Sequence, residues 1–255
     1  MSEIFTNLDN EFLKIYQKGW NQSVNDISSG VGMTFEKLLG KEEDDFSFPD
    51  FDGIEIKTQR INSNYPITLF GLAPWGNEFP EIERLRKSFG YFDFSPDDDK
   101  KLNVEFYHSK NVLVCNRYFF NLEISYEEER LYLIVKDINY NVIEKSAYWS
   151  FADIKEKLDG KLKYLGFVHA YSKKELGKEY FKYFRLECYK MRNFEKFLEL
   201  IEKNIICVSF TTSPVKYGPS TGKSKASCYF RIGKFDLNKL FTLDHYIDFN
   251  NQEHY

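Results

Sequence analysis

Apolar residues recur at helical spacing in two segments near the start of the chain, 8–20 and 31–39. The two stripes are Leu8, Phe12, Ile15, Tyr16 and Val31, Phe35, Leu38, Leu39. Gly40 follows the second stripe and is a typical helix stop. Glu36 falls at the edge of that stripe, about 115° from its centre at 100° per residue. We therefore expect Glu36 to be neither a core residue nor a fully solvated one.

Strand patterns dominate the rest of the chain and predict an α/β or α+β fold without internal repeats. The predicted β segments are 53–60, 66–74, 103–107, 111–124, 130–138, 161–172 and 179–189, with short strands between 205 and 249. Further helices are predicted at 80–89, 150–160 and 193–204, with Pro80 at the first start and Ser150 and Asn193 as N-caps. Residues 92–101 look like a linker, and 213–224 is a Gly, Ser and Pro-rich loop.

Composition adds few constraints. The 255 residues fit one large domain or two smaller lobes, and the 18% of aromatic residues is best explained as core and strand filling. The formal net charge of −4 argues against a protein that coats nucleic acid non-specifically, although it allows a locally basic surface.

The cysteines and histidines predict no zinc site. Cys115, Cys188, Cys207 and Cys228 form no CxxC pair, and no histidine lies at zinc-ligand spacing from them, so we expect isolated buried thiols. The four scattered histidines are expected to be structural or surface groups. The chain has no apolar run of about 18 residues and no secretory signal at its start, which predicts a cytoplasmic protein without a membrane span.

The segment "FPDFDGIEIKTQR", residues 48–60, carries the candidate chemistry. Residues two apart in a strand share a face, so Glu55 and Lys57 lie on one face and the two flanking isoleucines on the other. Asp50 precedes them in a turn. Two carboxylates can hold Mg²⁺, which activates water, and a nearby ammonium can orient that water and stabilise charge on a phosphate. Without further context, a solvated strand end with a surface ion pair is the simpler explanation.

The wider context resembles the MvaI/BcnI family of restriction endonucleases, which is related to the mismatch-repair nicking enzyme MutH. "GVGMTFEKLLG", "PDFDGIEIKTQR" and "ITLF" occur in the family's order and at compatible spacing. "LRKSFGY", "AYWSF" and "KLKYLGFVHAYSK" are also similar to family segments. The resemblance is dense over 30–91 and 147–184, thin over 92–145 and loose after 205.

The resemblance implies a restriction-endonuclease-like PD-(D/E)XK fold, a mixed sheet flanked by helices, with a catalytic lobe and a DNA-recognition lobe around a cleft. It implies one unit over 1–255, with a nuclease core at about 30–91, further core elements at about 147–184 and recognition elements at about 205–235. Carried over by position, Asp50 and Glu55 match the metal-binding carboxylates, Lys57 the catalytic lysine, and Glu36 the helix acid that supports the metal site. The implied cofactor is Mg²⁺, with Mn²⁺ able to substitute, in a one-metal or two-metal mechanism.

Two groups of cations are candidates for DNA binding. The interval 205–235 contains no Asp or Glu but includes Lys216, Lys223, Lys225 and Arg231. A solvated hairpin with a basic tip is the alternative there. The second group is Arg84, Arg86 and Lys87, for which the neighbouring Glu81 and Glu83 make a salt-bridged helix face the alternative.

The recognition region departs from the best-known relatives. Those relatives carry an arginine in the strand after the long helix and a histidine-containing stretch before a "FRI" strand. Here "FRI" is present, but "VSFTT" (208–212) has no arginine and "SKASCY" (224–229) has no histidine. Their C/G-rich target sites are therefore not transferred to this chain.

We expect a Mg²⁺-dependent type II restriction endonuclease that hydrolyses duplex DNA at a short specific sequence by metal-activated water. One alternative is a MutH-like enzyme that nicks one strand in DNA repair. The other is a catalytically inactive sequence-specific DNA-binding protein. The intact acids and lysine argue against this second alternative. The expected partners are double-stranded DNA and, without a stable complex, a cognate DNA methyltransferase in the same cell. A monomer is expected.

Overall fold

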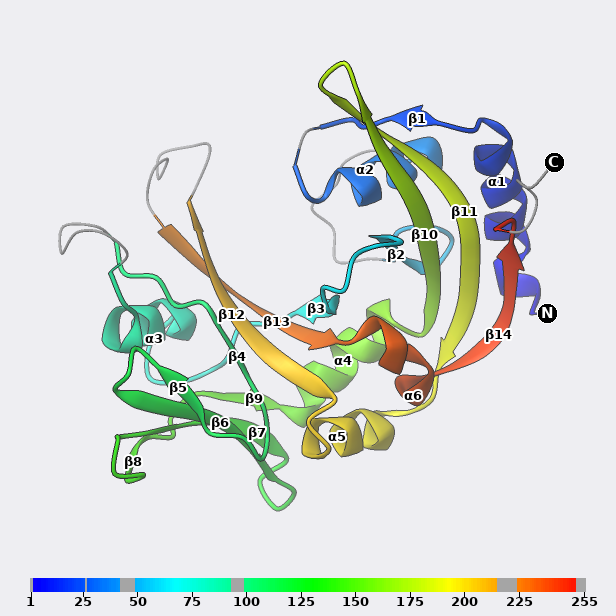
Figure 1. Cartoon of the computed structure of the whole chain (residues 1–255). Helices are drawn as coiled ribbons and strands as arrows, with labels where there is room; N and C mark the ends of the chain where they lie inside the picture. Colours follow the sequence, from blue (N-terminus) through cyan, green and yellow to red (C-terminus); the bar gives the residue numbers. More distant parts are fainter. Residues whose placement is uncertain (1, 26, 42–48, 93–98, 215–223, 251–255) are drawn as a thin grey trace. The chain divides into compact units, whose positions relative to one another are not determined.

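The computed structural model describes residues 2–25, 27–41, 49–92, 99–214 and 224–250. The chain divides into two compact units, each assembled from separate segments (Figure 1). Unit 1 comprises 1–65, 157–193 and 237–255, and unit 2 comprises 66–156 and 194–236.

Unit 1 is a mixed five-stranded sheet with helices packed against it. Its elements are η1 (Glu3–Phe5), α1 (Thr6–Gln17), β1 (Asn21–Gln22), α2 (Gly30–Leu38), β2 (Glu55–Arg60), β10 (Tyr164–Glu175), β11 (Lys178–Met191), α6 (Leu237–Leu240) and β14 (Phe241–Asp248). The strand order is β1-β11-β10-β2, and β14 also pairs with β11. The β2–β10 pair is parallel, and the other pairs are antiparallel.

The core of unit 1 forms where the predicted apolar stripes of α1 and α2 meet the sheet. The buried members of those stripes pack against buried side chains of β10 and β11 and against Ile54 and Ile56. Gly166 on β10 allows α1 to approach closely, because a Cβ at this position would lie 2.8 Å from a methyl carbon of Leu8. The Tyr183 hydroxyl of β11 donates a hydrogen bond to the Val31 carbonyl at 2.8 Å, which fixes α2 on the sheet. The predicted N-terminal helices are confirmed.

Unit 2 contains two antiparallel sheets. Its elements are β3 (Ile67–Gly71), α3 (Glu81–Phe89), β4 (Val104–Phe106), β5 (Val112–Val114), β6 (Tyr118–Ser125), β7 (Arg130–Lys136), β8 (Val142–Glu144), β9 (Tyr148–Ser150), α5 (Phe194–Glu202), β12 (Ile206–Pro214), β13 (Ser224–Ile232) and η2 (Lys234–Asp236). One sheet has the order β3-β13-β12-β4; the other has β5-β6-β7-β8, with β9 also on β7. Helix α4 (Phe151–Lys161) begins in unit 2 and ends in unit 1.

Aromatic side chains fill the core of unit 2. Phe70 and Phe230 stack with ring centroids 4.8 Å apart, and Phe197 lies 5.9 Å from both rings. Trp149 is fully buried, and its indole nitrogen donates to the Leu72 carbonyl at 2.9 Å, so its one polar atom is satisfied. The sequence-based interpretation of these aromatics as core filling is confirmed.

Most predicted elements of unit 2 are also confirmed, with local differences. The predicted β segment 111–124 is a hairpin, because Cys115 and Asn116 both adopt positive φ angles of 54° and turn the chain. Ser150 caps α4 as predicted, accepting the Asp153 amide at 3.0 Å. The predicted linker and the Gly, Ser and Pro-rich loop fall largely outside the described residues, in 93–98 and 215–223. No helix in the described part of the chain is long and apolar enough to cross a membrane.

Candidate functional site

A tight turn before β2 places Asp50 beside the strand. Asp52 and Gly53 both have positive φ angles, 46° and 81°, as a two-residue type I′ turn requires. Phe51 and Ile54 exchange both backbone hydrogen bonds across this turn, at 3.0 and 2.7 Å. The chain thereby reverses, and the Asp50 carboxylate accepts the backbone N–H of Ile56 at 2.9 Å.

Strand β2 presents Glu55 and Lys57 together, as the alternation of side chains predicts. Lys57 Nζ donates a hydrogen bond to Glu55 Oε1. The Glu55 side chain is only 1% exposed, whereas that of Lys57 is 23% exposed. Ile54 and Ile56 alternate with them and join the core of unit 1. The pair is therefore a partly buried ion pair of the sheet rather than a solvated surface ion pair.

Two further lysines, which no sequence motif predicts, contact the same carboxylates. Lys41, just after α2, lies 2.6 Å from Asp50 Oδ1. Lys161, at the end of α4, lies 3.5 Å from Glu55 Oε1. The available signals were weak: Lys41 borders an acidic segment, and Lys161 opens the family-like stretch 161–173.

Helix α2 supplies the third acid, Glu36, from beside β2. A Cβ on Gly32, one turn earlier, would lie 3.2 Å from Thr58 Oγ1 and 3.6 Å from Glu36 Oε1, so a side chain at position 32 would crowd this packing. The half-buried Glu36 carboxylate interacts electrostatically with Asp50 and with the lysines that contact the other two acids. Its intermediate burial matches the expectation from helical periodicity.

The three carboxyl groups differ in acidity because their surroundings differ. Burial raises the pKa of Glu55, and the charge of Asp50 raises it further, against the opposing effect of Lys57. Burial and the Asp50 charge also raise the pKa of Glu36. Burial opposes ionisation of Asp50 too, but the hydrogen bonds from Lys41 and from the Ile56 amide hold its pKa below the usual value. The group thus combines one firmly ionised carboxylate with two that bind protons more readily.

The donor atoms fit a divalent cation. Glu55 Oε2 is buried and has no hydrogen-bond partner among the described residues. A buried carboxylate oxygen without a partner is costly, and a hard cation coordinated by oxygen would satisfy it. The ionised Asp50 carboxylate borders the same strand. Asp50 and Glu55 are the residues that would hold such an ion.

Arg84 and Arg86 of α3 are engaged in ion pairs within unit 2. Arg84 donates to the fully buried Glu81 and, at 2.9 Å, to Glu144. Arg86 is only 6% exposed and donates to Glu83 at 2.7 Å. These contacts favour the salt-bridged alternative, and the DNA-binding role of the two arginines stays a prediction. The side chain of Lys87, the third residue of that group, is exposed.

The basic interval 205–235 forms the hairpin of β12 and β13 together with η2. Lys216 and Lys223 lie outside the described residues. Lys225, near the start of β13, is exposed. Arg231, near its end, is 23% exposed and donates at 3.2 Å to Glu105 of β4, which lies beyond β12 in the same sheet.

The chain is similar to known proteins along nearly its whole length. The MvaI/BcnI restriction endonuclease family matches residues 10–241. The solved structure "Restriction endonuclease MvaI-cognate DNA substrate complex" is similar with a TM-score of 0.87 and 30% identity, covering 95% of this chain and 98% of that one. The structure "Restriction endonuclease MvaI in the absence of DNA" has a TM-score of 0.59 and 29% identity, covering 97% and 98%. The curated proteins contain no match. Because the family covers nearly the whole sequence and its fold is shared, the chain belongs to the MvaI/BcnI restriction endonuclease family and is a type II site-specific deoxyribonuclease.

Proposed function

We propose that the enzyme uses Mg²⁺ to hydrolyse phosphodiester bonds of duplex DNA at a short specific sequence. The observation that carries this proposal is the convergence of Asp50, Glu55 and Lys57 at one strand, with a buried oxygen of Glu55 left without a partner. Restriction endonucleases generally need a divalent metal ion. A solved relative complexed with its cognate DNA substrate supports duplex DNA as the ligand.

In the proposed mechanism, each residue has a separate task. Asp50 and Glu55 would hold the ion, and a bound ion would supply positive charge at the scissile phosphate. The Lys57 ammonium, held in place by Glu55, orients the attacking water and stabilises negative charge that develops on the phosphate. Glu36 accepts a hydrogen bond from water at the site, because its raised pKa makes it a better proton acceptor than Asp50. In-line attack then leaves 5′-phosphate and 3′-hydroxyl ends.

We further propose that the two units have different functions. The four site residues belong to unit 1, which we assign to catalysis, and the basic hairpin belongs to unit 2, which we assign to DNA recognition. Within the hairpin, Lys225 and Arg231 are the described candidates for contacts to phosphates or bases. A cognate DNA methyltransferase would protect the cell's own target sites without a stable complex, and we propose that the endonuclease acts as a monomer in the cytoplasm.

Replacing Lys225 by glutamine should weaken DNA binding several-fold and reduce the salt dependence of binding. Loss of one phosphate contact lowers the slope of log affinity against log salt by about 1. Fluorescence anisotropy over a salt series measures this slope. Lys145→Gln is the control, because Lys145 is an exposed lysine of the same unit that pairs with Glu123 outside the basic interval. An unchanged slope for Lys225→Gln would remove this residue from the interface.

Cleavage of a supercoiled plasmid that carries many random sequences tests the proposed function directly. With Mg²⁺, the wild-type enzyme should give linear and then smaller products, and chelation by EDTA should stop the reaction. If only open circles accumulate, the repair-type nicking alternative is favoured. If the plasmid remains supercoiled over all metal concentrations while the protein still binds DNA, the inactive DNA-binding alternative holds.

A further inference from the structure

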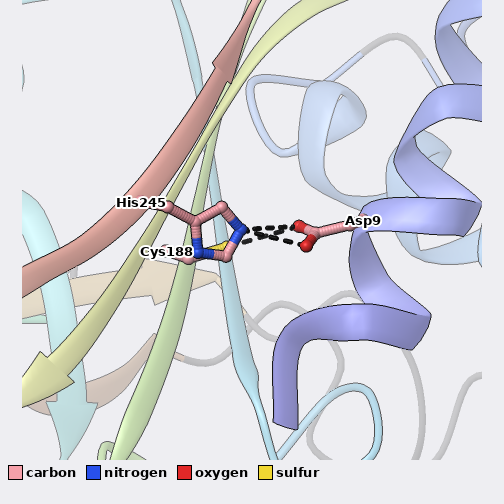
Figure 2. Close-up of side chains that lie close together, drawn as sticks. All are labelled: Asp9, Cys188 and His245. Carbon is pink, nitrogen blue, oxygen red and sulfur yellow. Dashed lines mark hydrogen bonds and ion pairs between the residues drawn. The ribbon is translucent and has the colours of Figure 1, made fainter. Parts of the chain in front are cut away.

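A second cluster of ligand-type side chains lies in unit 1, apart from the proposed catalytic residues. Asp9 of α1, Cys188 of β11 and His245 of β14 point toward one another (Figure 2). His245 Nε2 lies 3.0 Å from each oxygen of the Asp9 carboxylate. Cys188 Sγ lies 3.8 Å from Asp9 Oδ1, and the ligand atoms of the three residues all lie within 4.8 Å of one another.

The fold explains why no sequence motif predicts this cluster. His245 is paired in register with Cys188 across the antiparallel β11–β14 pair, which brings the imidazole and the thiol together. Helix α1 packs against the same sheet, and Asp9 extends from this helix toward the two strands (Figure 2). The three residues come from three distant parts of the chain, so a search for metal-ligand spacing excludes them. Cys188 is a free, buried thiol as expected, but it lies beside two other ligand-type side chains.

The histidine also has the outer partner that metal-bound histidines usually have. His245 Nδ1 lies 2.9 Å from Asp244 Oδ2. Asp244 is itself fixed by the Ser2 backbone N–H at 3.0 Å, by the Ser2 hydroxyl at 2.6 Å and by Lys190 at 3.0 Å. A carboxylate on one imidazole nitrogen orients the ring and directs the other nitrogen toward a metal ion. Here that other nitrogen, Nε2, faces Asp9, which also contacts the Cys188 thiol.

We propose that Asp9, Cys188 and His245 bind one divalent transition-metal ion, with Zn²⁺ as the best-suited occupant. Tetrahedral zinc bonds of about 2.0–2.3 Å need ligand atoms about 3.3–3.5 Å apart, and the observed separations of 3.0 and 3.8 Å bracket that range. A thiolate and an imidazole favour zinc or cobalt over Mg²⁺, which prefers oxygen donors. The fourth position is left for water, since the side chains of Asp9 and His245 are 18% and 10% exposed.

Binding would exchange protons for the ion without changing the net charge. The Cys188 S–H bond breaks and an S–metal bond forms. When His245 is protonated on both nitrogens and donates to both Asp9 and Asp244, the ion also replaces the proton on Nε2. The two protons go to solvent, and one dication takes their place. The site would join α1 to β11 and β14 and so tie the first helix of the chain to its last strand. An ion that binds only the folded state raises its stability.

Cobalt absorption spectroscopy on the purified full chain tests this site separately from any Mg²⁺ at the catalytic residues. Co²⁺ should give a near-ultraviolet thiolate-to-metal band that saturates at one ion per chain and disappears when Zn²⁺ is added. Cys188→Ser should lose the band and the zinc-dependent rise in melting temperature, and His245→Gln should weaken both. Cys207→Ser is the matched control, because Cys207 is a buried thiol of unit 2 outside the cluster, and should keep both.

The outcomes are decisive in both directions. If folded wild-type protein shows no thiolate band with Co²⁺, the three residues form only an internal hydrogen-bonded group and the proposal is overturned. A band that persists in folded Cys188→Ser also overturns it. Because the wild-type measurement alone can reject the site, the test does not depend on every variant folding. The result is also independent of DNA cleavage, which the proposed nuclease centre would carry out.

Discussion

Replacing Lys57 by methionine is expected to reduce DNA cleavage by about 10²–10³-fold or more while leaving DNA binding nearly unchanged. Removal of one group that stabilises charge in a transition state has an effect of this size. Methionine keeps much of the aliphatic length of lysine but has no ammonium to orient water or to stabilise the phosphate. Single-turnover cleavage rates with saturating enzyme and Mg²⁺ measure the effect.

The control for this variant is Lys14→Met. Lys14 is an exposed lysine of α1 that forms an ion pair with Glu11, one turn away, so its loss should leave cleavage unchanged. If Lys57→Met cleaves at the wild-type rate, the Glu55–Lys57 pair is a structural ion pair. Binding measured without metal separates a catalytic loss from a loss of affinity: a variant that no longer binds DNA would argue for a different role of Lys57.

Replacing Glu55 by glutamine is the second large expected effect. A metal ion stabilises the charge of the transition state by several kcal/mol, and raising the activation free energy by about 1.4 kcal/mol slows the reaction tenfold. We therefore expect the cleavage rate to fall by about 10²–10⁴-fold. The variant should also need more Mg²⁺ for half-maximal cleavage, because one negative ligand is lost. Glutamine has nearly the same volume, so the metal-free protein should remain folded. Cleavage rates over a Mg²⁺ series, compared with exposed Glu175→Gln, measure both effects.

The acidity of Glu55 adds a pH dependence with a definite sign. Burial raises the pKa of Glu55 above the usual value. As the pH falls, the Glu55 carboxylate therefore becomes protonated, and unable to bind the ion, at a higher pH than an exposed glutamate. Metal affinity should therefore fall as the pH is lowered, and additional Mg²⁺ should restore cleavage at low pH. Wild-type Mg²⁺ affinity that is flat from pH 7 to about pH 4.3, the ordinary glutamate range, would contradict the proposed ligand.

The local parts of the site could be predicted because they follow from rules of short range. Alternation along a strand places Glu55 and Lys57 on one face, and Asp52–Gly53 is a turn sequence that folds Asp50 back onto β2. The helical stripe places Glu36 at an edge. None of these inferences needs information from outside the segment 30–60.

The remaining parts depend on contacts between distant segments. Lys161 reaches Glu55 because α4 ends beside β10, whose Leu165 pairs in parallel register with Glu55. The i,i+3 spacing of Glu81 and Arg84 predicts an ion pair, but only the folded chain shows that Glu144 completes it. The two-unit division likewise depends on which distant strands pair, and local hydropathy carries no information about that.

The central claim is that the acids and lysine around β2 form a metal-dependent, sequence-specific nuclease centre. Sequencing the ends released from a pool of random duplex DNA tests it most directly. With Mg²⁺, the wild-type ends should share one short sequence at a fixed distance from the cut, and Asp50→Asn or EDTA should remove those ends. Ends without a shared sequence, or the same ends from Asp50→Asn at the wild-type rate, would contradict the account.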